Sequence, residues 1–136
     1  MREIKFRGSP IEDYDDLNWF EGGIYINQDE RLAYINTDYS GVVPVQWESV
    51  GQYTGLKDCN GVEIYEGDIT LDPIKNIKGV ICYDSHQTRY KFVPLDLYHA
   101  NARNGGWTGL ELNVNRRLPE VVGNIYEDRE LLTEEQ

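Results

Sequence analysis

Short runs of alternating apolar and polar residues, rich in Tyr, Val, Ile and Thr, recur along the whole chain and are separated by turn residues. This alternation is typical of β-strands, because successive side chains of a strand point to opposite faces. It predicts strands over residues 4–7, 22–26, 32–37, 42–50, 52–54, 64–65, 67–71, 79–83 and 90–93. The proline at position 44 confines its strand to an edge or a bulge. We therefore expect a mainly β fold, antiparallel and barrel-like or sandwich-like, with α+β as the alternative.

Two connections carry clear turn signals. Residues 27–30, Asn-Gln-Asp-Glu, have the length of a hairpin link, so the strands on either side should pair antiparallel. Asn60 and Gly61 form an Asn-Gly pair, which supplies the positive φ angles that a tight turn needs. Residues 99–109 are the longest stretch without a strand pattern and should form a surface loop.

Helix signals are scarce. The best candidate is a short helix near the C-terminus over residues 128–132. There Asp128 could cap the first turn, and Leu131 and Leu132 could dock back on the core.

Length and charge limit the number of domains and the kinds of partner that this chain can have. A chain of 136 residues is expected to form one domain, with a weak boundary near Gly51. Its 24 acids and 13 bases give a net charge of −11, which disfavours nucleic acid and anionic membranes as partners. No apolar run reaches the roughly 18 residues of a membrane span, and residues 1–7 do not resemble a signal peptide. We therefore expect a cytoplasmic protein.

Few residues of the sequence match catalytic or metal-binding patterns. Cys59 and Cys82 are expected to be thiols, and Cys82 alternates with Val80 as a small apolar residue on one strand face. Ser85 and His86 are adjacent, and in an extended chain they would point apart. The spacing of the two cysteines and two histidines does not resemble a zinc site. The sequence predicts no metal, no cofactor and no catalytic residue.

Two groups of acidic residues are candidates for function. Glu66 and Asp68 would share one strand face and could serve acid/base chemistry, but a solvated or turn-capping role is favoured. Between Arg7 and Arg31 there is no basic residue, and seven acids surround Trp19 and Phe20. This segment is either an acidic-aromatic face for a basic protein or, as we favour, a solvated loop whose two aromatic rings cap the core.

The segment from Tyr53 to Ile69, YTGLKDCNGVEIYEGDI, resembles the signature of the YopX family of phage and prophage proteins. Residues 1–7 and 120–132 resemble the two ends of that family, and Cys59 stands where the family commonly has Lys. The signature residues are Tyr53, Thr54, Gly55, Leu56, Asp58, Asn60, Gly61, Ile64, Tyr65, Gly67, Asp68, Gly123, Asn124 and Ile125. The resemblance implies a phage-encoded accessory protein, homo-oligomeric with a trimer as first guess, and brings no catalytic residues. Physically, these residues can build turns and core.

Three classes of function follow from this. The first is a non-enzymatic interaction module whose partner is an unknown host or phage protein. The second is an acidic mimic of nucleic acid that inhibits a host DNA-binding protein, and the third is a small hydrolase or ligand-binding barrel that uses Glu66 and Asp68.

Self-association is expected because ten tyrosines and three tryptophans exceed what a small core readily absorbs. The contact should use an aromatic, charge-poor patch or the local basic residues. The candidate interface residues are Arg103, Trp107, Arg116 and Arg117.

Overall fold

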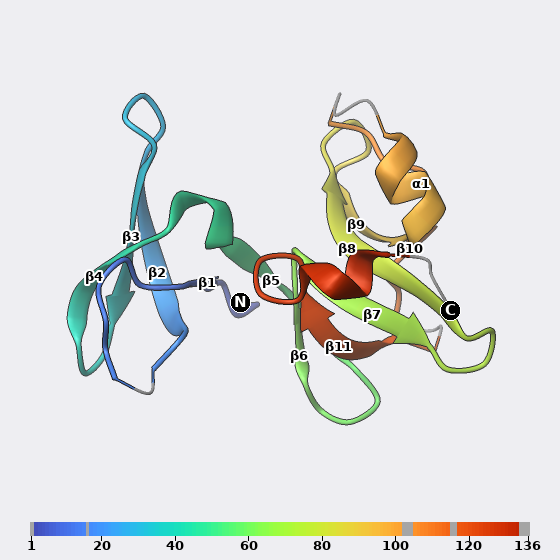
Figure 1. Cartoon of the computed structure of the whole chain (residues 1–136), viewed down its shortest axis with the longest axis horizontal. Helices are drawn as coiled ribbons and strands as arrows, with labels where there is room; N and C mark the ends of the chain where they lie inside the picture. Colours follow the sequence, from blue (N-terminus) through green and yellow to red (C-terminus); the bar gives the residue numbers. More distant parts are fainter. Residues whose placement is uncertain (1, 16, 102–104, 115–116, 134–136) are drawn as a thin grey trace. The chain divides into compact units, whose positions relative to one another are not determined.

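The computed structural model describes residues 2–15, 17–101, 105–114 and 117–133 (Figure 1). Within these residues the chain forms two antiparallel sheets, and neither closes into a barrel. The first sheet has the order β4-β3-β2-β1-β5-β6 and the second has the order β10-β9-β8-β7-β11. The strands are β1 (Phe6–Gly8), β2 (Phe20–Asn27), β3 (Leu32–Thr37), β4 (Gly41–Val45), β5 (Gly51–Lys57), β6 (Glu63–Tyr65), β7 (Asp68–Asp72), β8 (Ile77–Asp84), β9 (Arg89–Pro94), β10 (Leu110–Glu111) and β11 (Glu120–Asn124). The predicted mainly β, antiparallel fold class is confirmed.

The chain divides into two compact units, residues 1–55 (unit 1) and residues 56–136 (unit 2). The division falls within β5, a few residues beyond Gly51. Each unit has its own buried apolar residues.

Unit 1 is organised by the β2–β3 hairpin, which confirms the antiparallel pairing expected around residues 27–30. Its alternating residues place Ile35 and Val43 inward, and both are fully buried. β4 is the edge strand, as the proline predicted. The extended stretch predicted over residues 42–50 is wrong beyond Val45, because a 3-10 turn, η1 (Trp47–Ser49), follows. The Ser49 hydroxyl donates to the backbone carbonyl of Gln46, the residue before that turn, which stabilises the turn locally.

The acidic segment of unit 1 contributes to the core. Phe20 is 7% exposed and makes an edge-to-face contact with Tyr14, with ring centroids 5.0 Å apart. Trp19 is half-buried, and the guanidinium of Arg7 lies 4.9 Å from its ring centroid. The core-capping interpretation is confirmed for Phe20.

Unit 2 is built on its five-stranded sheet, which buries both faces. Val80 and Cys82 pack on one face together with the helix α1 (Leu95–Ala100), and Ile81 and Phe92 pack on the other. α1 contacts β8 and β9 (Figure 1). The loop predicted over residues 99–109 is therefore wrong at its first two residues, which belong to α1.

The helix expected at the C-terminus is a single 3-10 turn, η2 (Arg129–Leu132). Asp128 precedes it but makes no side-chain cap, since its carboxylate accepts a hydrogen bond from the backbone N–H of Asn124 instead. Leu132 does dock on the core cluster that contains Cys82. In the described part of the chain no helix is long and apolar enough to cross a membrane.

Candidate functional site

The turn between β5 and β6 is organised by the carboxylate of Asp58, which is 6% exposed. Its Oδ1 accepts the backbone N–H groups of Asn60 and Val62, each at 2.9 Å. Its Oδ2 accepts the N–H of Val121 in β11, also at 2.9 Å. Charge-assisted hydrogen bonds to a carboxylate are stronger than neutral ones. Asp58 therefore ties the central signature segment to the C-terminal one.

The tight turn predicted at Asn60 and Gly61 is confirmed, with a modified geometry. The N–H of Gly61 donates to the carbonyl of Asp58 at 3.0 Å, and the N–H of Asp58 donates to the carbonyl of Val62 at 2.8 Å. Positive φ is confined to Gly61, at 81°, and Asn60 does not share it. This is the three-residue type of hairpin connection, in which the left-handed residue after the turn is glycine.

The carboxylate pair predicted on one strand face is wrong. Glu66 and Gly67 form the turn between β6 and β7, and Gly67 has a φ of 92°. Asp68 is the first residue of β7, is 1% exposed, and accepts the backbone N–H of Tyr65 at 2.7 Å. Glu66 and Asp68 therefore belong to a turn and to a strand, and they do not share a strand face. The hydrogen bond from Tyr65 to Asp68 stabilises this turn.

The C-terminal signature residues also stabilise a backbone turn. Asn124 accepts the N–H groups of Tyr126 and Glu127 through its Oδ1, at 3.0 and 2.8 Å. A Cβ on Gly123 would lie 2.7 Å from the Oδ2 of Asp128, so the side chain of Asp128 would have to shift. The hydrogen bonds of this turn account for the asparagine.

The other signature residues lie in strands or turns. Ile64 is fully buried, as predicted for the core, while Leu56 is half-buried. Tyr53 and Tyr65 are buried, Thr54 and Ile125 are half-buried, and Gly55 is exposed with a φ of 89°. The signature is accounted for by turn and core structure.

Of the predicted interface residues, Trp107 and Arg117 are described, whereas Arg103 and Arg116 lie outside the described residues. Arg117 is exposed and lines a cavity of about 40 Å³. Trp107 is half-buried and lines a groove of about 770 Å³ beside the β8–β9 turn. The two residues therefore line different depressions of unit 2.

The groove at Trp107 has a buried ion pair in its lining that sequence reasoning missed. The Nζ of Lys91 donates to the Oδ2 of Asp84 at 2.7 Å, and the two side chains are 9% and 4% exposed. The hydrogen bond from Lys91, together with the backbone N–H of Trp107, holds the pKa of Asp84 well below its usual range. The sequence alone does not indicate this contact, because it follows from the register of β8 and β9. In that register Asp84 lies opposite Arg89 and Lys91 lies opposite Cys82, so Asp84 and Lys91 are diagonal neighbours.

The two cysteines behave as predicted. Cys82 is buried in the core, and burial first, then the carboxylate of Glu66, raises the pKa of its thiol to about 12. Cys59 is exposed. Ser85 and His86 lie in the β8–β9 turn and not in the extended chain assumed from the sequence. Among the described residues no group of three or more His, Cys, Asp or Glu side chains is placed to hold a metal ion.

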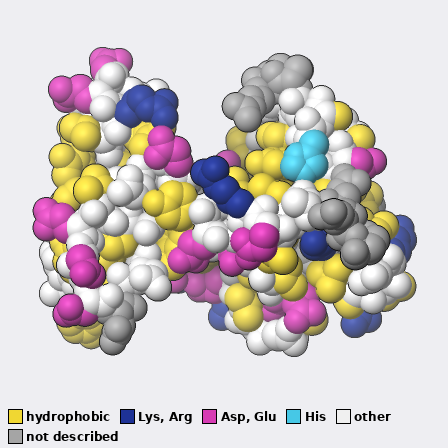
Figure 2. Space-filling view, in the orientation of Figure 1, with side chains coloured by type: hydrophobic (Ala, Val, Ile, Leu, Met, Phe, Trp, Pro, Cys, Tyr) yellow, Lys and Arg dark blue, Asp and Glu magenta, His cyan; other side chains and the backbone are white. Residues whose placement is uncertain are grey.

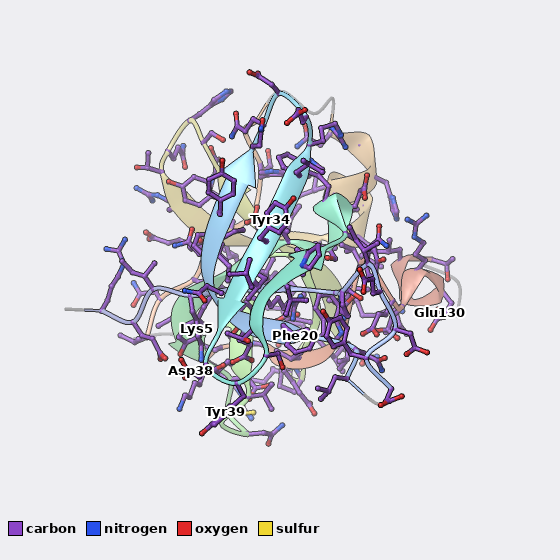
Figure 3. The ribbon with its side chains drawn as sticks, turned by 90° about the vertical axis from the view of Figure 1, so that its left-hand side faces the viewer. Lys5, Phe20, Tyr34, Asp38, Tyr39 and Glu130 are labelled. Atoms are coloured by element: carbon purple, nitrogen blue, oxygen red, sulfur yellow. The ribbon has the colours of Figure 1, made fainter. Side chains whose placement is uncertain are left out.

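The sequence also missed an exposed aromatic surface on unit 1, which we call the outer face. It consists of Tyr25, Leu32, Tyr34, Val42 and Pro44, on the side of β2, β3 and β4 opposite the buried core. Tyr25 is 64% exposed and Val42 63%, and the rings of Tyr25 and Tyr34 lie 6.0 Å apart. Figure 3 labels Tyr34 in this sheet and Tyr39 at the β3–β4 turn.

The outer face is poor in charge although its surroundings are acidic. Glu21 extends the same strand side, and its carboxylate lies 3.4 Å from the Nζ of Lys5. Acidic side chains surround hydrophobic patches on the visible side of unit 1 (Figure 2). An exposed apolar face of this kind is characteristic of contact surfaces.

Comparison with known proteins gives one family. A family model described as YopX protein matches residues 5–133. No curated protein matches the chain.

Proposed function

Since the chain belongs to the YopX family, we propose that it is a phage- or prophage-encoded accessory protein that works as a non-enzymatic interaction module. The module acts as a homo-oligomer, with a trimer as the first expectation. Its composite surface contacts a host or phage protein in the bacterial cytoplasm.

The observation that supports this proposal is the outer face of unit 1. Three of its residues, Tyr25, Leu32 and Val42, are 39% to 64% exposed, in a sheet whose other side carries the buried residues Ala33, Ile35, Val43 and Val45. Aromatic and aliphatic side chains without charge are what the centres of subunit interfaces contain. Tyrosine is favoured there because its ring buries apolar area while its hydroxyl finds a polar partner.

The negative net charge of the chain favours the outer face as the site of self-association. Copies with a net charge of −11 repel one another wherever carboxylates meet. Repulsion is weakest where charge is absent or paired, and on this side of the sheet Glu21 is accompanied by Lys5. The remaining exposed carboxylates of unit 1 then stay available for a basic partner protein.

Light scattering on the full chain across micromolar concentrations tests the proposal. The wild type should exceed the 15.8 kDa of one chain, and Tyr34→Glu should shift the particle toward that mass. A carboxylate placed within an apolar contact should raise the dissociation constant by at least about 100-fold.

Tyr39→Glu is the matched control, because Tyr39 is fully exposed in the β3–β4 turn and does not belong to the outer face. It should associate like the wild type. A 15.8 kDa particle for the wild type at every concentration would refute the oligomer, and equal effects of the two variants would refute the outer face.

A further inference from the structure

The groove beside the β8–β9 turn lies in unit 2 and is separate from the outer face. Its volume is about 770 Å³, within the range of small-molecule sites. The ion pair of Lys91 and Asp84 lines it together with Leu97 of α1 and the half-buried ring of Trp107.

In the ion pair, Lys91 keeps one N–H that can still donate, whereas the carboxylate of Asp84 has no accepting position left. Asp84 receives four donors, from the Nζ of Lys91 and from the backbone N–H groups of His86, Gln87 and Trp107. A carboxylate has about four lone-pair positions, so its accepting capacity is used. Lys91 donates to Asp84 and to the carbonyl of Trp107, and no described residue accepts its third N–H. The buried ammonium can therefore donate to a ligand oxygen.

The rim of the groove carries side chains that can both donate and accept. Gln87, His86 and Thr108 line it, and all three are exposed. Their amide, imidazole and hydroxyl groups match hydroxyls, which also donate and accept. Trp107 supplies an apolar wall, and its ring is held in place by stacking on Tyr98 at 5.3 Å between centroids and 9° between planes.

Electrostatics favour a neutral ligand. The charges of Lys91 and Asp84 cancel within the groove. Residues 56–136 carry 14 Asp and Glu against nine Lys and Arg, a net charge of −5, so anions are repelled from unit 2 as a whole.

We propose that this groove binds a neutral sugar unit. One sugar oxygen accepts the third N–H of Lys91, the apolar C–H face of the ring packs on Trp107, and the remaining hydroxyls bond to Gln87 and the rim. The proposal does not rest on the oligomer, since every residue it uses lies in unit 2.

Amide NMR spectra of the full chain test it, with glucose, N-acetylglucosamine and maltose as probes up to about 50 mM. At least one saccharide should produce saturable shifts at the amides of Gln87, Lys91 and Trp107. Uracil and inorganic phosphate are the comparison probes, since neither contains a sugar, and they should leave these amides unchanged.

Two variants complete the test. Gln87→Ala should raise the dissociation constant of the saccharide by about 5- to 10-fold through loss of a hydrogen bond. Gln28→Ala is the matched control, because Gln28 is also an exposed glutamine in a hairpin turn but lies in unit 1. It should bind like the wild type. No saccharide shift at these amides, stronger shifts from phosphate or uracil, or equal effects of the two variants would overturn the assignment.

Discussion

Removal of the Asp58 carboxylate should destabilise unit 2 more than its place in a surface turn suggests. Asp58→Ala loses three hydrogen bonds of 2.9 Å. Two of them are local to the turn, and their N–H groups can turn to water. The third joins the turn to Val121 in β11, which is half-buried. At about 0.5 kcal/mol for each local bond and about 1–2 kcal/mol for the bond to β11, we expect a loss of about 2–3 kcal/mol.

Asp72→Ala is the matched control. Asp72 also holds a turn through its Oδ1, which accepts the N–H groups of Ile74 and Lys75 at 3.0 and 3.2 Å, but both partners lie in its own turn. Its removal should cost only about 0.5–1 kcal/mol. The difference between the two variants isolates the bond to β11.

Urea unfolding followed by fluorescence gives both values. Trp107 is the only tryptophan of residues 56–136, so a background with Trp19→Phe and Trp47→Phe reports unit 2 alone. The slope of the free energy against urea should stay constant across the variants. A loss for Asp58→Ala no larger than that for Asp72→Ala would refute the role of Asp58 in joining the two signature segments.

Three further outcomes follow from the structure. Gly61→Val should lower the unfolding free energy by more than about 1 kcal/mol, because a β-branched residue is strained at a φ of 81°; an unchanged urea midpoint would contradict this. The lowered pKa of Asp84 should give stability that is present above about pH 4 and lost as the pH falls toward its folded-state pKa, and urea midpoints from pH 7 to about pH 3 should fall less in Asp84→Asn. Iodoacetamide should modify exposed Cys59 well before Cys82, whose pKa is raised to about 12, and mass spectrometry of the folded protein would reveal the reverse order.

The sequence predicted the strands best where alternation is long. β3 has the bounds that alternation indicates, and the tight turn at Gly61 follows from its dipeptide. α1 was missed because its six residues are too few to show a helical period. Trp47–Ser49 was misread as strand because its 3-10 turn depends on a hydroxyl bond that the pattern does not reveal.

The candidate sites were harder to predict than the strands. Trp107 was singled out, but the groove it lines depends on Asp84 and Lys91, which approach only through the β8–β9 register. Tyr25 and Tyr34 fit the alternation of their strands and lie opposite each other in the sheet. Alternation alone does not show which side of a sheet is covered by the core. Glu66 and Asp68 were misplaced because Glu66 and Gly67 form a turn that ends β6 before Asp68 begins β7.

Photo-crosslinking from the outer face tests the central proposal most directly. A benzophenone amino acid placed at Tyr34 should give, in the purified chain at micromolar concentration, a covalent product of twice the 15.8 kDa chain mass. The same group at Ile74, which is 72% exposed in unit 2, should give little or none. A product from position 34 alone is the result that self-association through the outer face requires. No product from position 34, or equal yields from both positions, would contradict it.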